Sequence, residues 1–216
     1  MLDAADGRKV PVRLEWSRFR AEDGGVLALR DITRQREATR RYEWEALHDA
    51  VTGMPNRRAF AKALHEAFAR FQRDATNAVL ILIDLDHFKR VNDVGGHDAG
   101  DEMLQAVAEV LTAVVRAADL PARIGGDEFA LLLSGCTHAR AHEIAESVRA
   151  GIQALGIWRN DQRLTVGVSQ GISSFQSGDL GAEGIRQRAD EACYRAKESG
   201  RNKIEIALPA AVMSGH

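Results

Sequence analysis

The chain has 216 residues, of which 45% are hydrophobic and 28% are charged, and its formal net charge is −2. These values are typical of one globular domain with some additional length, and the lack of a basic excess argues against a nucleic-acid partner. No apolar run approaches the ~18 residues of a membrane-spanning helix, and Cys136 and Cys193 are too far apart in the sequence to form a CxxC metal pair. We therefore expect a cytoplasmic protein with no membrane segment in this chain.

The N-terminal segment is predicted to form two strands and one helix. Residues 9–16 alternate apolar and polar side chains, residues 21–25 carry a turn signal, and residues 26–29 form the second strand. Two strands cannot build a stable core alone. Residues 33–50 are rich in charge and lack Gly and Pro, so we expect a connecting helix, which could also pair as a short coiled coil.

The remaining chain alternates helices and strands. Asn56 is predicted to cap an amphipathic helix with Phe60, Leu64, Phe68 and Phe71 on one face. Further strands are predicted over 78–83, 122–124, 129–133, 164–174 and 203–206, and further helices over 101–116, 137–155 and 185–197. From residue 78 the order is β-α-β-β-α-β, followed by one more helix and strand. This order predicts an α+β fold of the ferredoxin-like type, with helices packed on one sheet.

Acidic residues stand at two predicted strand ends. Asp84 follows a fully apolar strand, and Asp127 and Glu128 lie in the hairpin turn of RIGGDEFALLL. If Asp84 and Asp127 converge, two carboxylates ~4 Å apart repel by ~4 kcal/mol at an effective dielectric of 20, and a divalent cation would offset that repulsion. Gly125 and Gly126 would let a phosphate approach the backbone closely. The alternative is a solvated turn and an ordinary strand end.

Four segments in order resemble the diguanylate cyclases, the GGDEF family, which join two GTP molecules into cyclic di-GMP. The segments are HDAVTGMPNRRAF at 48–60, DLDHFKRVNDVGGHDAGD at 84–101, GGDEF at 125–129 and YRAKESGRNKI at 194–204. The first departs from the family pattern only in that Val51 and Met54 replace two leucines. The resemblance covers about residues 47–207 and implies the palm-like sheet of nucleotide cyclases and polymerases.

The resemblance implies a metal site and a reaction. Asp84, the backbone carbonyl of Leu85 and Asp127 would hold Mg²⁺ or Mn²⁺, with help from Glu128. Asp127 would also serve as the base for a 3′-hydroxyl that attacks an α-phosphate, with pyrophosphate leaving. Lys89 would stabilise charge on the phosphates in the transition state.

The resemblance also implies substrate contacts. Lys197 and Arg201, one helical turn apart, would grip the outer phosphates, although a solvated helix end would explain them equally well without the motif. Asn92 and Asp101 would bind guanine, because a carboxylate accepts from the adjacent N1–H and N2 amine that adenine lacks. Asp101 could instead serve as a first-turn acid of the following helix, and that role does not exclude ligand binding.

A product site, a dimer and a sensor are further implications. Arg116 and Asp119 stand where the family places an inhibitory RxxD motif that binds cyclic di-GMP. Because one domain binds one GTP and the product needs two, the resemblance implies a head-to-head homodimer. Residues 6–37 resemble the end of a PAS sensor domain, so either the chain is a fragment of a longer protein or these strands pack in another way. The predicted domains are a PAS-like piece at 1–32, a linker helix at 33–50, the GGDEF domain at 51–208 and a tail at 209–216.

Two other functions remain open at this level. The chain could be a catalytically silent module that binds GTP or cyclic di-GMP as a receptor, or a pure dimerisation domain. Degenerate modules usually lose the signature acids or the lysine, and all of them are present here. An active enzyme is therefore the favoured hypothesis.

Overall fold

The computed structural model describes residues 2–3, 9–18 and 25–209. The chain divides into two compact units, Met1–Ala46 and Leu47–His216. Part of the predicted turn at 21–25 and most of the predicted tail at 209–216 lie outside the described residues. Within the described residues, no helix has the length and apolar character needed to cross a membrane.

The N-terminal unit consists of short antiparallel strand pairs and one helix. Its elements are β1 (Leu2–Asp3), β2 (Lys9–Val10), β3 (Val12–Arg18), β4 (Gly25–Asp31) and α1 (Thr33–Glu45). The strand predicted over 9–16 is interrupted at Pro11, which has no N–H to donate to a ladder. The helix predicted over 33–50 ends at Glu45, and residues 47–56 form a separate turn closed by a bridge between His48 and Pro55.

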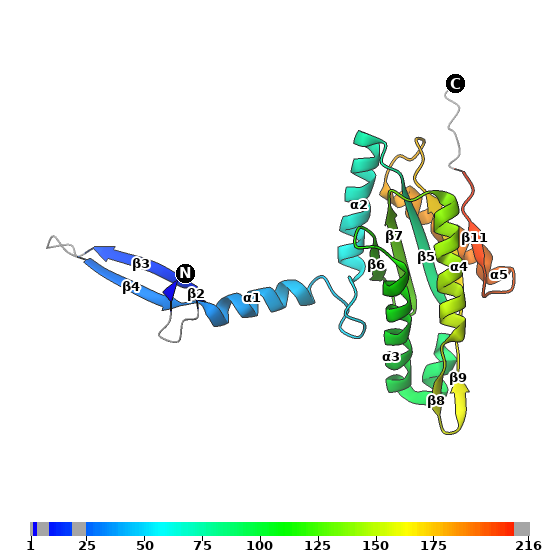
Figure 1. Cartoon of the computed structure of the whole chain (residues 1–216), viewed down its shortest axis with the longest axis horizontal. Helices are drawn as coiled ribbons and strands as arrows, with labels where there is room; N and C mark the ends of the chain where they lie inside the picture. The colour runs from blue at the N-terminus through cyan, green and yellow to red at the C-terminus, as the bar shows by residue number, and fades with distance from the viewer. Residues whose placement is uncertain (1, 4–8, 19–24, 210–216) are drawn as a thin grey trace. The chain divides into compact units, whose positions relative to one another are not determined.

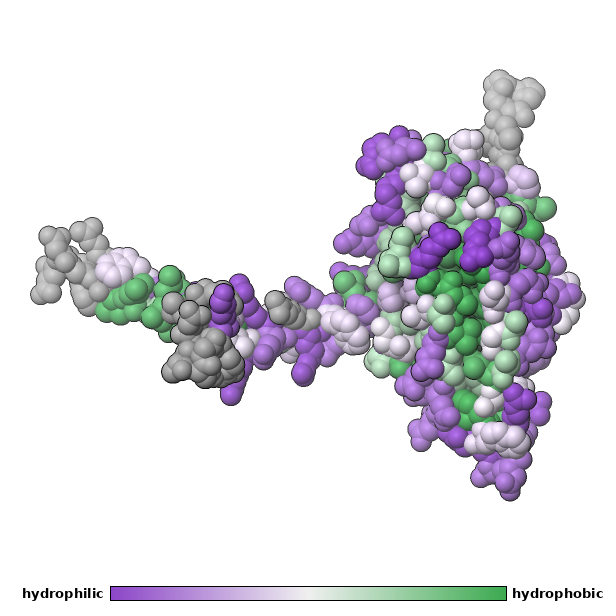
Figure 2. All heavy atoms as spheres, viewed as in Figure 1, coloured by the Kyte–Doolittle hydropathy of each residue, from purple (hydrophilic) through white to green (hydrophobic). Residues whose placement is uncertain are grey.

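One face of the β3–β4 hairpin is apolar and exposed. Leu14 pairs with Leu29 and Trp16 pairs with Leu27, so these four side chains share a face, and each is more than half exposed. The apolar colour along this hairpin is visible in Figure 2. This agrees with the expectation that two strands do not build a core.

The C-terminal unit is built on a five-stranded sheet. Its elements are α2 (Arg57–Asp74), β5 (Ala78–Asp86), α3 (Phe88–Val114), β6 (Leu120–Arg123), β7 (Glu128–Ser134), α4 (His138–Ala154), β8 (Ile157–Arg159), β9 (Gln162–Leu164), β10 (Gly167–Ser174), α5 (Ala182–Glu198) and β11 (Ile204–Ile206). The strand order is β11-β10-β5-β7-β6, with only β11 and β10 parallel (Figure 1). The β-α-β-β-α-β prediction and the α+β class are confirmed.

Strand β5 divides the core into two layers because successive side chains point to opposite faces of the sheet. Ile81 and Ile83 pack in the cluster formed with α3 and α4, whereas Leu80 and Leu82 pack in the cluster formed with α2 and α5. The same alternation directs Asp84 toward the α2 and α5 face.

Two segments differ from the prediction. The helix predicted over 101–116 begins earlier than expected: residues 88–95 form the first half of α3, which kinks at Gly96 (φ +77°) before its second half. The strand expected over 164–174 is β10 preceded by a separate β8–β9 hairpin. Asn160 and Asp161 both have positive φ at the tip of that hairpin, which is the conformation of a tight two-residue turn.

Candidate active site

The register between β5 and β7 brings together acids that are more than forty residues apart in sequence. Asp84 lies directly opposite Glu128, and the N–H of Leu85 donates to the carbonyl of Asp127 at 3.1 Å. Directly paired residues of antiparallel strands project from the same face. The C-terminal end of β5 and the GGDEF hairpin therefore form one acidic end of the sheet, which we call the acidic edge.

Lys197 of α5 lies against this acidic edge. Its Nζ is 2.6 Å from Oδ2 of Asp84, and the two side chains are 34% and 14% exposed. Burial raises the pKa of Asp84 above its usual value; Lys197 opposes this rise, and the charges of Asp127 and Glu128 add to it. Burial acts to lower the pKa of Lys197, but the hydrogen bond and charge of Asp84 outweigh it and raise that pKa. The site therefore favours a bound cation.

The donor chemistry fits a hard divalent cation. The carboxylates of Asp84, Asp127 and Glu128 offer oxygen ligands of the kind that Mg²⁺ and Mn²⁺ take. Within the part of the chain that the structure describes, no three His, Cys, Asp or Glu side chains are grouped closely enough to hold a metal by themselves. A cation here would complete its coordination with substrate oxygens and water, as Mg²⁺ sites at phosphates usually do.

Arg123 fixes the backbone of the GGDEF hairpin. Its Nη1 is 2.8 Å from Oδ1 of Asp49, and its Nε and Nη2 donate to the carbonyls of Gly125 and Gly126. Burial acts to raise the pKa of Asp49, but hydrogen bonds from Arg123 and Thr52 outweigh it and lower that pKa. Neither residue was predicted to belong to the site, although Asp49 lies in the 48–60 segment of the family resemblance and Arg123 stands two residues before the GGDEF signature.

The two glycines of the hairpin differ in what surrounds them. A Cβ on Gly125 would lie 2.3 Å from Oε2 of Glu128, so the carboxylate of Glu128 folds back over this residue. A Cβ on Gly126 would meet nothing within 4 Å, and its backbone is open to a ligand. Arg57 supports the same turn, since its Nε donates to the carbonyl of Ile124 and its Nη2 lies 3.7 Å from Oε2 of Glu128.

The N-terminus of α3 follows β5 immediately. The helix starts at Phe88, and His87 at its N-cap (φ +60°) makes no side-chain capping bond. The first N–H groups of a helix and its dipole attract anions, and Lys89 lies in this first turn. These backbone donors can bind phosphate, and the sequence did not reveal them because the predicted helix began only at residue 101.

The kink in α3 lies between the two predicted guanine ligands. Asn92 lies before Gly96, and Asp101 lies after it. A Cβ on Gly100 would lie 1.9 Å from Oδ1 of Asn92, so the Asn92 side chain occupies the space beside Gly100, the residue that precedes Asp101. Asp101 itself is exposed.

Arg201 does not continue the helix that carries Lys197, contrary to the prediction that the two lie one helical turn apart on it. Helix α5 ends at Glu198, and Gly200, Arg201 and Asn202 all have positive φ. The N–H of Arg201 donates to the carbonyl of Ala196, which turns the chain back at the helix end. Arg201 is thus an exposed residue of a tight loop rather than of the helix surface.

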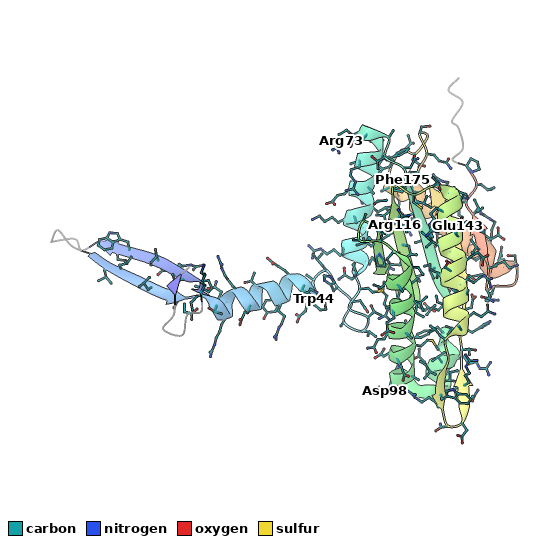
Figure 3. The ribbon with its side chains drawn as sticks, in the orientation of Figure 1. Trp44, Arg73, Asp98, Arg116, Glu143 and Phe175 are labelled. Atoms are coloured by element: carbon teal, nitrogen blue, oxygen red, sulfur yellow. The ribbon has the colours of Figure 1, made fainter. Side chains whose placement is uncertain are left out.

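The structure does not bring Arg116 and Asp119 to this edge. Asp119 accepts from the N–H of Arg116 and from the N–H of Ser134, the last residue of β7. Since Glu128 begins β7, the two ends of this strand are about 20 Å apart at ~3.4 Å per residue. Figure 3 shows Arg116 beyond the C-terminal end of α3, whereas Asp98, which follows the kink at Gly96, lies at the far end of the second half of this helix.

A cavity of about 670 Å³ between α2 and α5 opens onto the acidic edge. Phe60, Leu64 and Leu82 contribute apolar walls, and Asp84 and Lys197 contribute charged ones. Its position beside the proposed metal ligands makes it part of the same site.

Comparison with known proteins gives a consistent result. A sequence model described as "Diguanylate cyclase, GGDEF domain" matches residues 46–203. The diguanylate cyclase DgcP of Pseudomonas aeruginosa is 40% identical over 163 residues, which is 76% of this chain and 24% of that protein. The probable diguanylate cyclase DgcE of Escherichia coli is 35% identical over 86% of this chain and 17% of its own length. The chain thus spans a quarter or less of these two relatives.

Solved structures of similar fold include DgcB from Caulobacter crescentus. Its coiled coil and GGDEF domain, crystallised in complex with c-di-GMP, align with a TM-score of 0.76 at 30% identity. The alignment covers 82% of this chain and 93% of that one. The similarity therefore extends over nearly the whole crystallised DgcB segment.

Proposed function

The chain belongs to the GGDEF family of diguanylate cyclases, and we propose that it condenses two GTP molecules into cyclic di-GMP with release of two pyrophosphates. The observation that carries this proposal is the β5–β7 register, which sets Asp84 opposite Glu128 and beside Asp127, with Lys197 against them. Phosphoryl transfer depends mainly on positioning and on charge stabilisation, and this edge offers both.

Asp84, the backbone carbonyl of Leu85 and Asp127 would hold Mg²⁺ or Mn²⁺, with Glu128 contributing an oxygen from across the strand pair. When bound, the cation would neutralise charge on the phosphates and polarise the α-phosphate. Asp127 would take the proton of the attacking 3′-hydroxyl, as its place in the hairpin next to the metal ligands supports. The leaving pyrophosphate carries away the electron pair of the broken P–O bond.

The triphosphate would lie between two positive elements. On one side the N–H groups at the start of α3 and Lys89 would bind phosphate oxygens, and Gly126 would leave room for them. On the other side Lys197 and Arg201 would hold the outer phosphates. Asn92 and Asp101 would bind the guanine edge, and a good bidentate base contact discriminates by ~1–3 kcal/mol.

The reaction would require two protomers because each domain presents one such site. A two-fold homodimer would place two bound GTP molecules face to face. Helix α1 directly precedes the domain in the sequence and would control the pairing of the two protomers. The PAS-like segment of residues 1–32 would supply the signal for that control.

The decisive experiment is to incubate the purified chain with GTP and Mg²⁺ and to measure cyclic di-GMP by chromatography. Asp127→Ala should abolish product, whereas Glu109→Ala, which removes an exposed acid on α3, should leave it unchanged. Normal turnover by Asp127→Ala would mean that the metal site is wrongly assigned.

Arg116 and Asp119 would form a separate inhibitory site for the product. Arg116→Ala should keep the initial rate and relieve inhibition by added cyclic di-GMP; unchanged product binding would exclude this site. The alternative function, a silent receptor, predicts no turnover with intact binding of GTP or cyclic di-GMP, which calorimetry would detect.

A further inference from the structure

Asp86 is a buried carboxylate that neither the metal site nor the phosphate contacts use. It is the last residue of β5 and is 4% exposed. Its Oδ1 accepts from the hydroxyl of Ser169 at 2.8 Å, and its Oδ2 accepts from the backbone N–H of Asn202 at 2.9 Å. A buried carboxylate is costly unless it is hydrogen-bonded, and here both oxygens have donors.

The hydrogen bond from the Asn202 N–H to Asp86 holds a strained loop. Gly200, Arg201 and Asn202 have φ values of +113°, +61° and +49°, and side chains other than glycine rarely adopt this region. Such a conformation persists only where surrounding contacts determine it. The loop is fixed by the Arg201 N–H on the carbonyl of Ala196, by the Asn202 N–H on Asp86, and by the carbonyl of Lys203, which accepts from Gln170.

A surface cavity of about 730 Å³, which Gly167 and Asn202 also line, reaches Asp86. Gly167 faces it across the β5–β10 pair, and a Cβ there would lie 3.2 Å from Oδ2 of Asp86 and 3.4 Å from Cβ of Asn202. The carboxylate, the loop and the start of β10 therefore contact one another closely at Gly167. Loss of the carboxylate would free the loop at the position adjacent to Arg201.

We propose that Asp86 is a positioning residue for phosphate binding: it holds the loop of residues 199–203 so that Arg201 faces the outer phosphates of GTP. The inference rests on the proposed function. Asp86 also stands three residues before Lys89, so one buried side chain connects the two phosphate-binding elements, the start of α3 and the end of α5.

The test compares binding of GTP and GMP, in the presence of Mg²⁺, by calorimetry with the whole chain. Asp86→Ala should weaken GTP binding about tenfold, as expected for the loss of one charge-assisted phosphate contact, and should leave GMP binding within about twofold. Arg201→Ala should have the same effect, and the double variant should be no weaker than Arg201→Ala alone, because Asp86 acts through Arg201. Ser169→Ala keeps the Asn202 bond and should bind GTP normally.

Asp86→Asn keeps an oxygen for the Asn202 N–H and places its amide toward the Ser169 hydroxyl, so it should restore most of the GTP affinity. This variant carries the test if Asp86→Ala fails to fold. Additive effects in the double variant, or equal losses for GTP and GMP, would overturn the inference while the proposed function stands. Failure of the unaltered chain to bind GTP would overturn both.

Discussion

Gly100→Ala should weaken GTP binding while changing the stability of the fold little. Gly100 lies in the second half of α3 without a positive φ, so alanine fits the backbone and gains ~1 kcal/mol of helix propensity. The new Cβ would lie 1.9 Å from Oδ1 of Asn92 and 3.3 Å from Cζ of Phe88. Asn92 must then leave its place. A side chain forced from its rotamer costs ~0.5–1.5 kcal/mol, so the change in unfolding free energy should lie within about 1 kcal/mol of zero.

The effect on GTP should be larger. If Asn92 and Asp101 bind guanine together, displacing Asn92 removes a base contact worth ~1–3 kcal/mol, which corresponds to a loss of about 5- to 150-fold in affinity. Calorimetry with GTP and ATP should show that selectivity for GTP falls with the affinity. Asn92→Ala should give a similar loss, and Gly100→Ala should add little to it, because both variants remove the same contact.

Gly184→Ala is the matched control. Gly184 lies in the first turns of α5, has no positive φ, and a Cβ there would meet nothing within 4 Å. This variant should gain the same ~1 kcal/mol of helix propensity and should keep GTP binding. If Gly100→Ala bound GTP as tightly as the unaltered chain, Asn92 could not be a guanine ligand in the position that Gly100 provides.

Three further outcomes follow from the charges and burial. Asp49→Asn should lower the free energy of unfolding by ~1–3 kcal/mol at pH 7, as measured by urea denaturation. Because folding lowers the pKa of Asp49, its ionised carboxylate stabilises the fold above the usual pKa of 3.8, and this stabilisation is lost as pH falls through the lower folded pKa. The stability of the variant should lack this dependence on acid pH. Lys197→Met removes the group that opposes the raised pKa of Asp84, so the acid limb of Mn²⁺ binding without nucleotide should move to higher pH, whereas Lys197→Arg should leave it in place. Burial raises the pKa of Cys193 to about 12, so iodoacetamide at pH 8 should modify it only after unfolding, as mass spectrometry would show.

The sheet was predictable because its central strand has an unambiguous signal. Residues 78–83 form a continuous apolar run, as expected for a strand buried on both faces, and β5 is the middle strand of the five. The order of the following elements then permitted few topologies. Asn56 was also identified correctly, since its Oδ1 accepts from the N–H groups of Arg58 and Ala59 at the start of α2.

The errors in secondary structure arose at glycines and short turns. No helix was predicted across Gly95 and Gly96, but only Gly96 leaves the helical region, and the chain resumes a helix directly after it. A Cβ on Gly95 would lie 2.8 Å from Cδ1 of Leu164, so that glycine serves the packing of the β8–β9 hairpin against α3. The backbone at both glycines depends on contacts with residues distant in the sequence, which a local pattern does not contain.

The acids of the site could be named from the sequence, but their partners could not. A motif points to Asp84 and Lys197 separately, whereas their 2.6 Å contact depends on where α5 crosses the sheet. The Asp49–Arg123 pair is similar, because its residues lie 74 positions apart and meet through the turn that precedes α2. Side-chain pairing between distant segments follows from strand register and helix packing, and neither is encoded in a local pattern.

The charges of the acidic edge suggest an order of events in substrate binding. Asp84, Asp127 and Glu128 are opposed by Lys197, so the four groups leave a formal charge of −2, which one divalent cation neutralises. The Lys197 ammonium and the cation would compete for the same Asp84 oxygen, since both are attracted to it at contact distance. A triphosphate supplies the ammonium with another anionic partner. We therefore expect cation and nucleotide to bind cooperatively, with Lys197 leaving Asp84 for the phosphates, and the Mn²⁺ affinity should rise when GTP is present.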